Sequence, residues 1–308
     1  MNNEKYLFIR ILKAIMTIWF VWTLVFCLTR LTGDPVEWIL DASGSVEAKE
    51  QLRHNLGLDL PLWEQYLNGL KGLFTGDNGN SYYYARPVSD LFAERLGATA
   101  KLGLATLIVT IIIGIPIGVL TAVKHGTTFD SVTMGVTIIG YTVPNFVFGI
   151  LLIFIFSLKL RMLPSGSTGT WQHMILPTIA MAVGPTATAA RLTRSSLLDV
   201  IRQDYLDSAR AKGVYEWKVV LKHALRNALI PVITILGAQL STIIGGSVVV
   251  ETVFAWPGIG TLIVTAAQQR DFPVVQYGVL LISICVTFIN LAVDISYGLL
   301  DPRIRDSY

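Results

Sequence analysis

Residues 102–123 read LGLATLIVTIIIGIPIGVLTAV and contain no Asp, Glu, Lys or Arg. A helix needs ~20 largely apolar residues to cross the hydrocarbon core of a bilayer, so this stretch is long enough to span a membrane. Four further stretches are also free of acidic and basic residues: 131–158, 174–190, 228–250 and 274–293. One of them, 174–190, falls slightly short without its flanks. So many charge-free runs are hard to place in a water-soluble core, and they predict an all-α integral membrane protein.

A sixth apolar segment lies near the beginning of the chain, at about 7–29. Its two charges, Arg10 and Lys13, stand near one end, from which long basic side chains reach the membrane surface. A cleavable signal peptide is the alternative, but no small-x-small cleavage site follows the apolar run, so we predict a retained helix. With this segment the count is six transmembrane helices. Composition also favours a membrane protein, because charged residues make up only 15% of the chain and mean hydropathy is +0.58.

The distribution of Lys and Arg predicts the orientation of these six helices. Segment 191–227 carries eight of them, and further ones lie in the N-terminal region, after the second span and in the tail at Arg303 and Arg305. The short connections on the opposite side hold only Lys159, Arg161 and Arg270. Basic residues in short loops concentrate on the cytoplasmic side of a membrane. We therefore predict that both termini and segment 191–227 are cytoplasmic.

The longest connection, about 31–98, falls on the opposite, extracytoplasmic side. Turn signals stand at 33–35 and 76–79, and two short helices are predicted between them, at 47–55 and 62–73. This insert is interpreted as a small cap, with an ordered loop that has no binding role as the alternative. The predicted division has four parts: an N-terminal segment with the first helix (1–30), the insert (31–98), a transmembrane core (99–300) and a tail (301–308).

The cytoplasmic segment is polar but patterned. A helix capped by Ser195 or Ser196 is predicted to run to a stop at Gly213, because apolar residues recur every three or four positions. A second amphipathic stretch follows at 215–227. A basic amphipathic helix often rests on lipid headgroups, which is the alternative reading. Acidic residues among the basic ones favour docking into a groove of a partner protein instead; they are Asp199, Asp204, Asp207 and Glu216.

Within this segment, DYLDSARAKG at 204–213 and HALRNALIP at 223–231 resemble the EAA loop of ABC-importer permeases. Asp207, Ser208, Ala209 and Gly213 fall on the E-A-A-x-x-x-G positions, with Asp in place of Glu and Ser in place of the first Ala. Arg226 stands where the general pattern has Pro. These departures are similar to the branch that imports oligopeptides, dipeptides, nickel and related ligands. Further stretches resemble the same branch along nearly the whole chain: 33–35, 250–260, 270–273 and 294–303.

The resemblance implies a type I ABC-importer permease fold of six transmembrane helices, in a bacterial or archaeal cytoplasmic (inner) membrane. It implies a coupling helix that seats in a cleft of a cytoplasmic ATPase. It also implies partners: a homologous second permease that completes a heterodimeric pore, two ABC ATPases and an extracytoplasmic binding protein. Peptides are the first expectation for the cargo, followed by nickel or metal chelates. The implied ATPase-coupling residues are Asp204, Tyr205, Asp207, Ser208, Ala209, Arg210, Ala211, Lys212 and Gly213.

No catalytic motif is evident in the sequence. The chain has no Gly-Lys dipeptide and so no P-loop, and its four histidines show no zinc-binding spacing. We expect no metal, cofactor or nucleic acid to be bound by this chain, so ATP and magnesium would bind to the partner ATPases. A secondary transporter or channel without an ATPase is the alternative function, but it predicts ion-coupling acids at mid-membrane. A membrane-embedded enzyme predicts clustered catalytic groups, and the spans show neither.

Polar and aromatic residues near the spans give a candidate substrate path or gate. Asn145 follows Pro144 and breaks the third span, a feature tolerated where backbone faces protein or a water-filled cavity. Glu251, Phe254 and Trp256 close the fifth span, and the resemblance places them in a re-entrant stretch near the pore. A simple interfacial anchor is the alternative for this stretch. Asp294 is less favoured as a ligand, since it lies near the cytoplasmic end of the last span.

Overall fold

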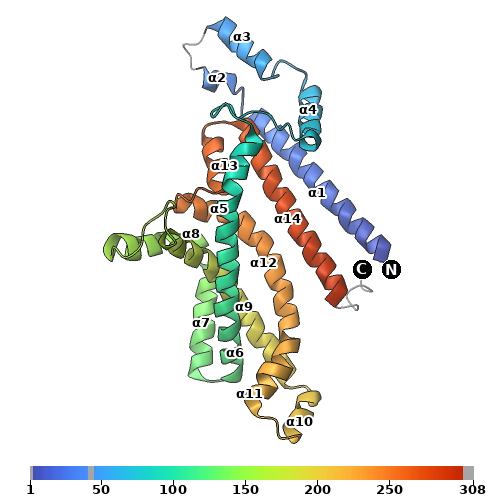
Figure 1. Cartoon of the computed structure of the whole chain (residues 1–308), viewed down its shortest axis with the longest axis vertical. Helices are drawn as coiled ribbons and strands as arrows, with labels where there is room; N and C mark the ends of the chain where they lie inside the picture. The colour runs from blue at the N-terminus through green and yellow to red at the C-terminus, as the bar shows by residue number, and fades with distance from the viewer. Residues whose placement is uncertain (1–2, 41–44, 301–308) are drawn as a thin grey trace. The chain divides into compact units, whose positions relative to one another are not determined.

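The computed structural model describes residues 3–40 and 45–300, which are almost entirely helical (Figure 1). Within these residues no strand is formed, and the one extended pairing is an isolated bridge between Asn80 and Pro87. The predicted tail at 301–308, with Arg303 and Arg305, lies outside the described residues. The chain falls into two compact units. We call residues up to Thr99 with 257–288 the cap unit, and residues 100–256 with those from Ile289 the core unit.

The cap unit contains the first helix and the predicted insert. The two short helices predicted in the insert are confirmed as α3 and α4, and Ser45 caps α3, because its hydroxyl accepts a hydrogen bond from the Ala48 amide. A buried apolar cluster that includes Phe92 and Leu262 joins α5 to α13 and α14. The helices of this unit are α1 (Asn3–Leu31), α2 (Val36–Ile39), α3 (Val46–Asn55), α4 (Leu62–Thr75), α13 (Ile259–Gln268) and the first parts of α5 (Val88–Val109) and α14 (Phe272–Leu300).

A buried carboxylate, Asp271, holds the loop that follows α4. It accepts hydrogen bonds from the Ser81 hydroxyl and from the backbone amides of Tyr82 (3.0 Å) and Tyr83 (3.3 Å). A buried charge is costly unless it is fully hydrogen-bonded, and here three donors meet that need. The insert is thereby tied to the turn between α13 and α14, far along the chain.

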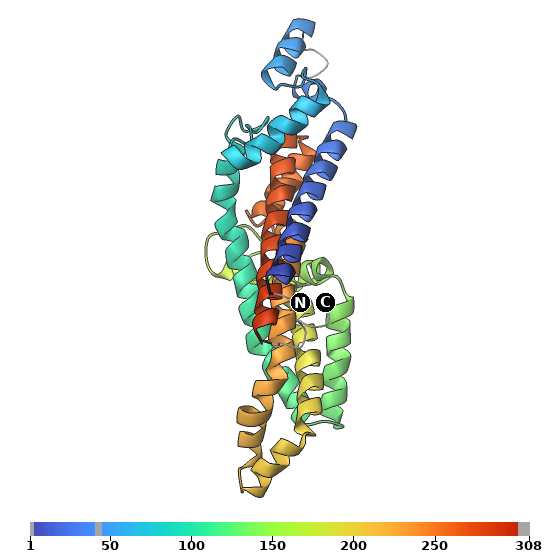
Figure 2. The ribbon, with the colours of Figure 1, turned by 90° about the vertical axis from the view of Figure 1, so that its right-hand side faces the viewer.

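The core unit is organised around α9, which packs against α6, α7, α8 and α12. Figure 2 shows α7 (green) beside α9 (yellow). Glycines allow the close approach, because a Cβ on Gly118 would stand 2.5 Å from the Ala190 carbonyl oxygen and from Thr193. The helices of this unit are α6 (Ile115–Val123), α7 (Thr128–Thr142), α8 (Asn145–Leu152), α9 (Gln172–Ile201), α10 (Asp204–Ala211), α11 (Glu216–Lys218) and α12 (Leu225–Val253). π-helical turns extend α5, α8 and α11 at Thr110–Gly114, Ile153–Lys159 and Val219–Ala224.

Four of the described helices are long and apolar enough to cross a membrane. The number of candidate spans is five if one bent pair of helices is counted as a single span. The pair is α7 with the helix from Asn145 to Lys159, which meet at 101° where Pro144 and Asn145 interrupt the predicted third span. The predicted fourth span lies in α9, which is outside this set. Many small residues and two prolines reduce its hydropathy, and much of α9 is buried among other helices, where lipid-facing side chains are not required. The structure therefore gives five candidate spans at most where six were predicted, and α9 lies at the position of the remaining one.

Candidate functional site

The predicted coupling segment is two helices and not one. Ser195 and Ser196 were expected to cap a new helix, but they lie inside α9, which continues to Ile201. This part of the prediction is wrong, because the chain turns only at Arg202 and Gln203, where Gln203 adopts an extended conformation. The short helix α10 then begins at Asp204, and acidic residues in its first turn suit the positive end of a helix dipole.

One buried residue, Leu206, anchors α10 to the core unit. Its side chain is fully buried in an apolar cluster with Leu197 and Val200 of α9, Val219 of the following segment and Ala122 of α6. Leu206 was not among the residues predicted from the sequence, although a leucine among polar neighbours can indicate a buried contact. The predicted coupling residues around it are exposed, apart from the half-buried Ala209 and Arg210. Gly213 ends the segment with a φ of 77°, a conformation that favours glycine.

Charged side chains brace this segment internally. Arg210 binds Asp207 at 2.7 Å and also binds both carboxylate oxygens of Glu216, at 3.0 and 3.1 Å. The hydrogen bonds from Arg210 lower the pKa of Glu216, and the two acids raise the pKa of Arg210. Two of the four acids expected to face a partner are therefore already paired within the chain. The Tyr205 hydroxyl accepts a hydrogen bond from Asn227 at 2.8 Å and fastens α10 to α12.

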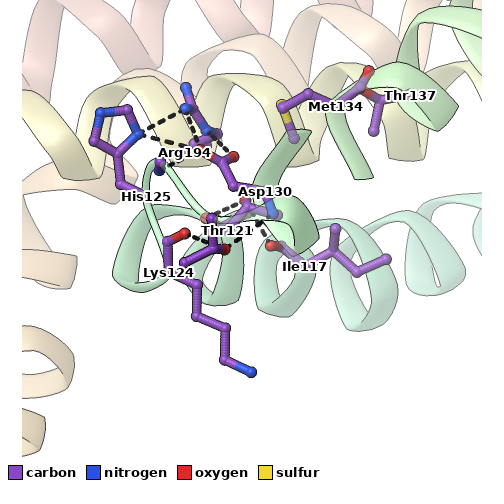
Figure 3. A network of polar contacts seen from close by, with 11 residues as sticks. Ile117, Thr121, Lys124, His125, Asp130, Met134, Thr137 and Arg194 are labelled. Carbon is purple, nitrogen blue, oxygen red and sulfur yellow. Dashed lines mark hydrogen bonds and ion pairs between the residues drawn. The ribbon is translucent and has the colours of Figure 1, made fainter. Parts of the chain in front are cut away.

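A second charged cluster joins the beginning of α7 to α9, a few residues before α9 ends and the coupling segment follows (Figure 3). Asp130, in the first turn of α7, has a side chain that is only 4% exposed. Arg194 of α9 donates from Nε to Oδ1 at 2.6 Å and from its terminal nitrogen to Oδ2 at 2.7 Å. The Gly126 amide also donates to Oδ2 at 3.1 Å, and the His125 ring nitrogen Nδ1 lies 3.2 Å from it. We call Asp130 and Arg194 the α7–α9 pair.

The α7–α9 pair was not predicted from the sequence. Arg194 was only one of the basic residues of the cytoplasmic segment, and Asp130 had no predicted role. The local signal is the spacing of Thr127 and Asp130, since Thr127 caps α7 by accepting a hydrogen bond from the Asp130 amide. That spacing predicts a helix start. It does not predict a partner 64 positions along the chain.

The structure separates the four predicted gate residues into two places. Asn145, the first residue of α8, lines a groove in the core unit. Glu251, Phe254 and Trp256 are buried and are not part of its lining. Phe254 packs against Gly149 of α8 and accepts a hydrogen bond from the Ser167 amide at 2.8 Å. A gate at these three residues stays a prediction.

The groove has a volume of about 390 Å³ and lies between the bend of α7 and α8, the middle of α9 and the middle of α12. Its walls mix apolar side chains with hydroxyl and carboxamide groups. Among the described residues, the buried Oε1 of Gln239 has no hydrogen-bond partner. The lining residues are Tyr141, Asn145, Met181, Gly184, Pro185, Thr188, Ile235, Ala238, Gln239, Thr242, Ile243 and Gly246. Within the described part of the chain no group of three or more His, Cys, Asp or Glu side chains could hold a metal ion.

Comparison with known proteins gives a consistent set of relatives. Residues 114–306 match the family described as the binding-protein-dependent transport system inner membrane component, and residues 4–103 match its N-terminal companion. The chain is 40% identical to the dipeptide transport system permease protein DppB of Escherichia coli K12, over 89% of this chain and 91% of DppB. It is 41% identical to the glutathione transport system permease protein GsiC of the same strain, over 98% and 99% of the two chains.

Among solved structures, the chain resembles one of the inward-facing MetNI methionine ABC transporter. The TM-score is 0.54 at 20% sequence identity, and the match covers 68% of this chain and 96% of the other. At this identity the match supports the fold alone. That fold is the type I importer permease expected from the sequence.

Proposed function

Because the chain belongs to the family of binding-protein-dependent transport system inner membrane components, in which it is an ABC-importer permease, we propose that it imports short peptides as half of a heterodimeric pore. A second, homologous permease would supply the other half, and an extracytoplasmic binding protein would deliver the cargo. Two cytoplasmic ATPases would bind ATP and magnesium and supply the energy. The relatives named for dipeptide and glutathione transport support peptides as cargo, since both substrates are short peptides.

The observation that carries the coupling part of the proposal is the geometry of α10. Its exposed surface carries Asp204 and Asp207, and the exposed Lys212 follows directly, while Leu206 and the Tyr205 hydroxyl fix α10 to neighbouring segments of the core unit. A short helix held in this way moves together with the helices to which it is attached when a partner displaces it. Its charged surface suits a groove in another protein. The groove beside Asn145 is proposed as part of the peptide path, because it combines carboxamides with an apolar wall, as a peptide requires.

The alternative of a secondary transporter or channel has no support in the family to which the chain belongs. A secondary transporter or channel would also have no cytoplasmic ATPase to bind the exposed face of α10. The two proposals differ in one measurable property, which is whether uptake requires a cognate ATPase.

The test places a bulky side chain on the exposed face of α10. We expect Ala211→Trp to abolish co-purification of the ATPases and to reduce ATP-dependent uptake of a labelled dipeptide about tenfold or more, by obstructing a docked surface. Ala93→Trp is the matched control, because Ala93 is also an exposed alanine on a helix but belongs to the cap unit. If Ala211→Trp left both assembly and uptake at the level of Ala93→Trp, the coupling role of α10 would be wrong.

A further inference from the structure

We propose that the α7–α9 pair fastens α7 to the lever formed by α9 and α10, so that movement of α10 reaches the bend between α7 and α8. This inference rests on the proposed function, because it takes α10 to be the surface on which the ATPase acts. Asp130 and Arg194 are assigned here as positioning residues, since they act through the helices that they join.

The pair has the geometry of a rigid fastener. Two parallel hydrogen bonds join a planar guanidinium to a planar carboxylate, which fixes their relative orientation as well as their distance. The carboxylate is almost fully buried and the Arg194 side chain is 21% exposed, so water competes weakly for these bonds. Asp130 also stands in the first turn of α7, where the helix dipole favours a negative charge. Exposed ion pairs, by contrast, are worth little and give way easily.

The path from α10 to the pair is short. Leu206 of α10 is buried against Leu197 of α9, which lies three residues after Arg194 on the same helix. Tyr205 and Arg210 hold α10 to the segments that follow it. A displacement of α10 is therefore carried directly by the end of α9 on which Arg194 stands.

The path from the pair to the groove runs along α7. Asp130 lies near the start of α7, and this helix ends at the 101° bend where Asn145 begins α8 and lines the groove. Elsewhere the contacts given between α7 and α9 are not hydrogen bonds, such as Gly140 against Val183 and the Arg191 guanidinium over the Tyr141 ring at 5.2 Å. Packed helices slide past each other by small shear movements, and such contacts permit this. The directional pair removes that freedom at the end of α7 nearest to α10.

A purely structural role is the competing explanation, in which the pair only stabilises the turn between α6 and α7. The two explanations differ in what is lost when the pair is weakened. A structural role predicts loss of assembled protein, while the fastener predicts assembled protein that hydrolyses ATP without transporting efficiently.

The experiment uses the full transporter, purified with its partner subunits and reconstituted in proteoliposomes. Asp130→Asn keeps the shape of the side chain and removes its charge, whereas Arg194→Lys keeps the charge and removes the planar fork. The matched controls are Arg86→Lys and Glu94→Gln, which alter an exposed Arg–Glu pair of 2.6 Å in the cap unit. Assembly, ATP hydrolysis and uptake of a labelled dipeptide are measured on every variant.

We expect both pair variants to assemble and to hydrolyse ATP, with dipeptide uptake per ATP reduced about tenfold, within the range of coupling between sites in proteins. The control variants should retain the wild-type ratio. An unchanged ratio in an assembled Asp130→Asn or Arg194→Lys transporter would overturn the proposal. Loss of assembly in both would overturn it as well, because the pair would then serve folding alone.

A distance measurement separates this proposal from the identity of the cargo. Spin labels are placed at exposed Val132 on α7 and Lys222 after α10, in a chain carrying Cys27→Ser and Cys285→Ser. In the wild type the distance between the labels should stay constant when ATP is added, and in Asp130→Asn it should shift or broaden. If the wild type transports no dipeptide but shows this contrast, the proposed cargo is wrong and the fastener stands. If the label distance behaves alike in both, the fastener is wrong.

Discussion

At the scale of single residues, the structure divides the acids of the cytoplasmic segment into two kinds. Asp207 and Glu216 are satisfied by Arg210 within the chain, whereas Asp204 is exposed in the first turn of α10. The acids therefore have two roles and not one. Asp207 and Glu216 stabilise the conformation of the segment through Arg210, and Asp204 is exposed to a partner protein.

The bond between Arg210 and Glu216 makes the segment sensitive to acid. Since Arg210 lowers the pKa of Glu216 below its ordinary 4.5, the folded state favours the ionised form, and the stabilisation is fully present above that value. It is lost as pH falls through the lowered pKa. We therefore expect hydrogen exchange at 204–216, corrected for the intrinsic rate, to be protected alike at pH 7 and pH 6 and to accelerate once the pH falls well below the ordinary 4.5.

The control for this acid response is Glu216→Gln, which cannot ionise and still accepts a hydrogen bond. It should show weaker protection at pH 7 and a smaller change on acidification. An equal pH response in the wild type and in Glu216→Gln would remove Glu216 from the explanation.

At the scale of helices, the local pattern of apolar residues predicted which helices form better than it predicted where each helix ends. The apolar runs predicted α5 with α6, α12 and α14, and Pro144 with Asn145 predicted the bend of the third span. The junction of α9 and α10 was missed, because residues 198–209 keep a helical period across it. Only the extended backbone of Gln203 separates the two helices, and no residue there has a strong helix-breaking preference. The α7–α9 pair was missed for a different reason, since a contact between distant residues follows from packing and not from local pattern.

Close packing of α6 on α9 leads to a prediction for Gly118. A Cβ at this position would stand 2.5 Å from a backbone carbonyl oxygen of α9, so Gly118→Ala requires the two helices to separate. We expect this overpacking to destabilise the protein by about 1–3 kcal/mol, measured by thermal unfolding in detergent.

Gly135→Ala is the matched control for Gly118→Ala. Gly135 is also a helical glycine in the core unit, but a Cβ there would meet no atom within 4 Å. Alanine is the better helix former, so this variant should be neutral or stabilised by up to about 1 kcal/mol. Equal effects of the two substitutions would show that backbone entropy, and not helix contact, governs both.

At the scale of the whole molecule, the prediction concerns which side of the membrane each unit's polar segments face. Basic residues are concentrated in 191–227, and short loops rich in Lys and Arg stay on the cytoplasmic side. We expect the α10 segment to lie inside and α4 of the insert outside. Single cysteines at Lys212→Cys and Phe74→Cys test this in the Cys27→Ser, Cys285→Ser background, because both positions are exposed.

A membrane-impermeant maleimide should label Phe74→Cys in intact cells, and Lys212→Cys only after the cells are permeabilised. Ile112→Cys is the control, since Ile112 is exposed in the middle of an apolar run and should resist the reagent in both conditions because lipid covers it. Labelling of Lys212→Cys in intact cells would place α10 outside. No cytoplasmic ATPase could then reach α10, so the orientation result decides whether the coupling surface and the α7–α9 pair can have the roles proposed for them.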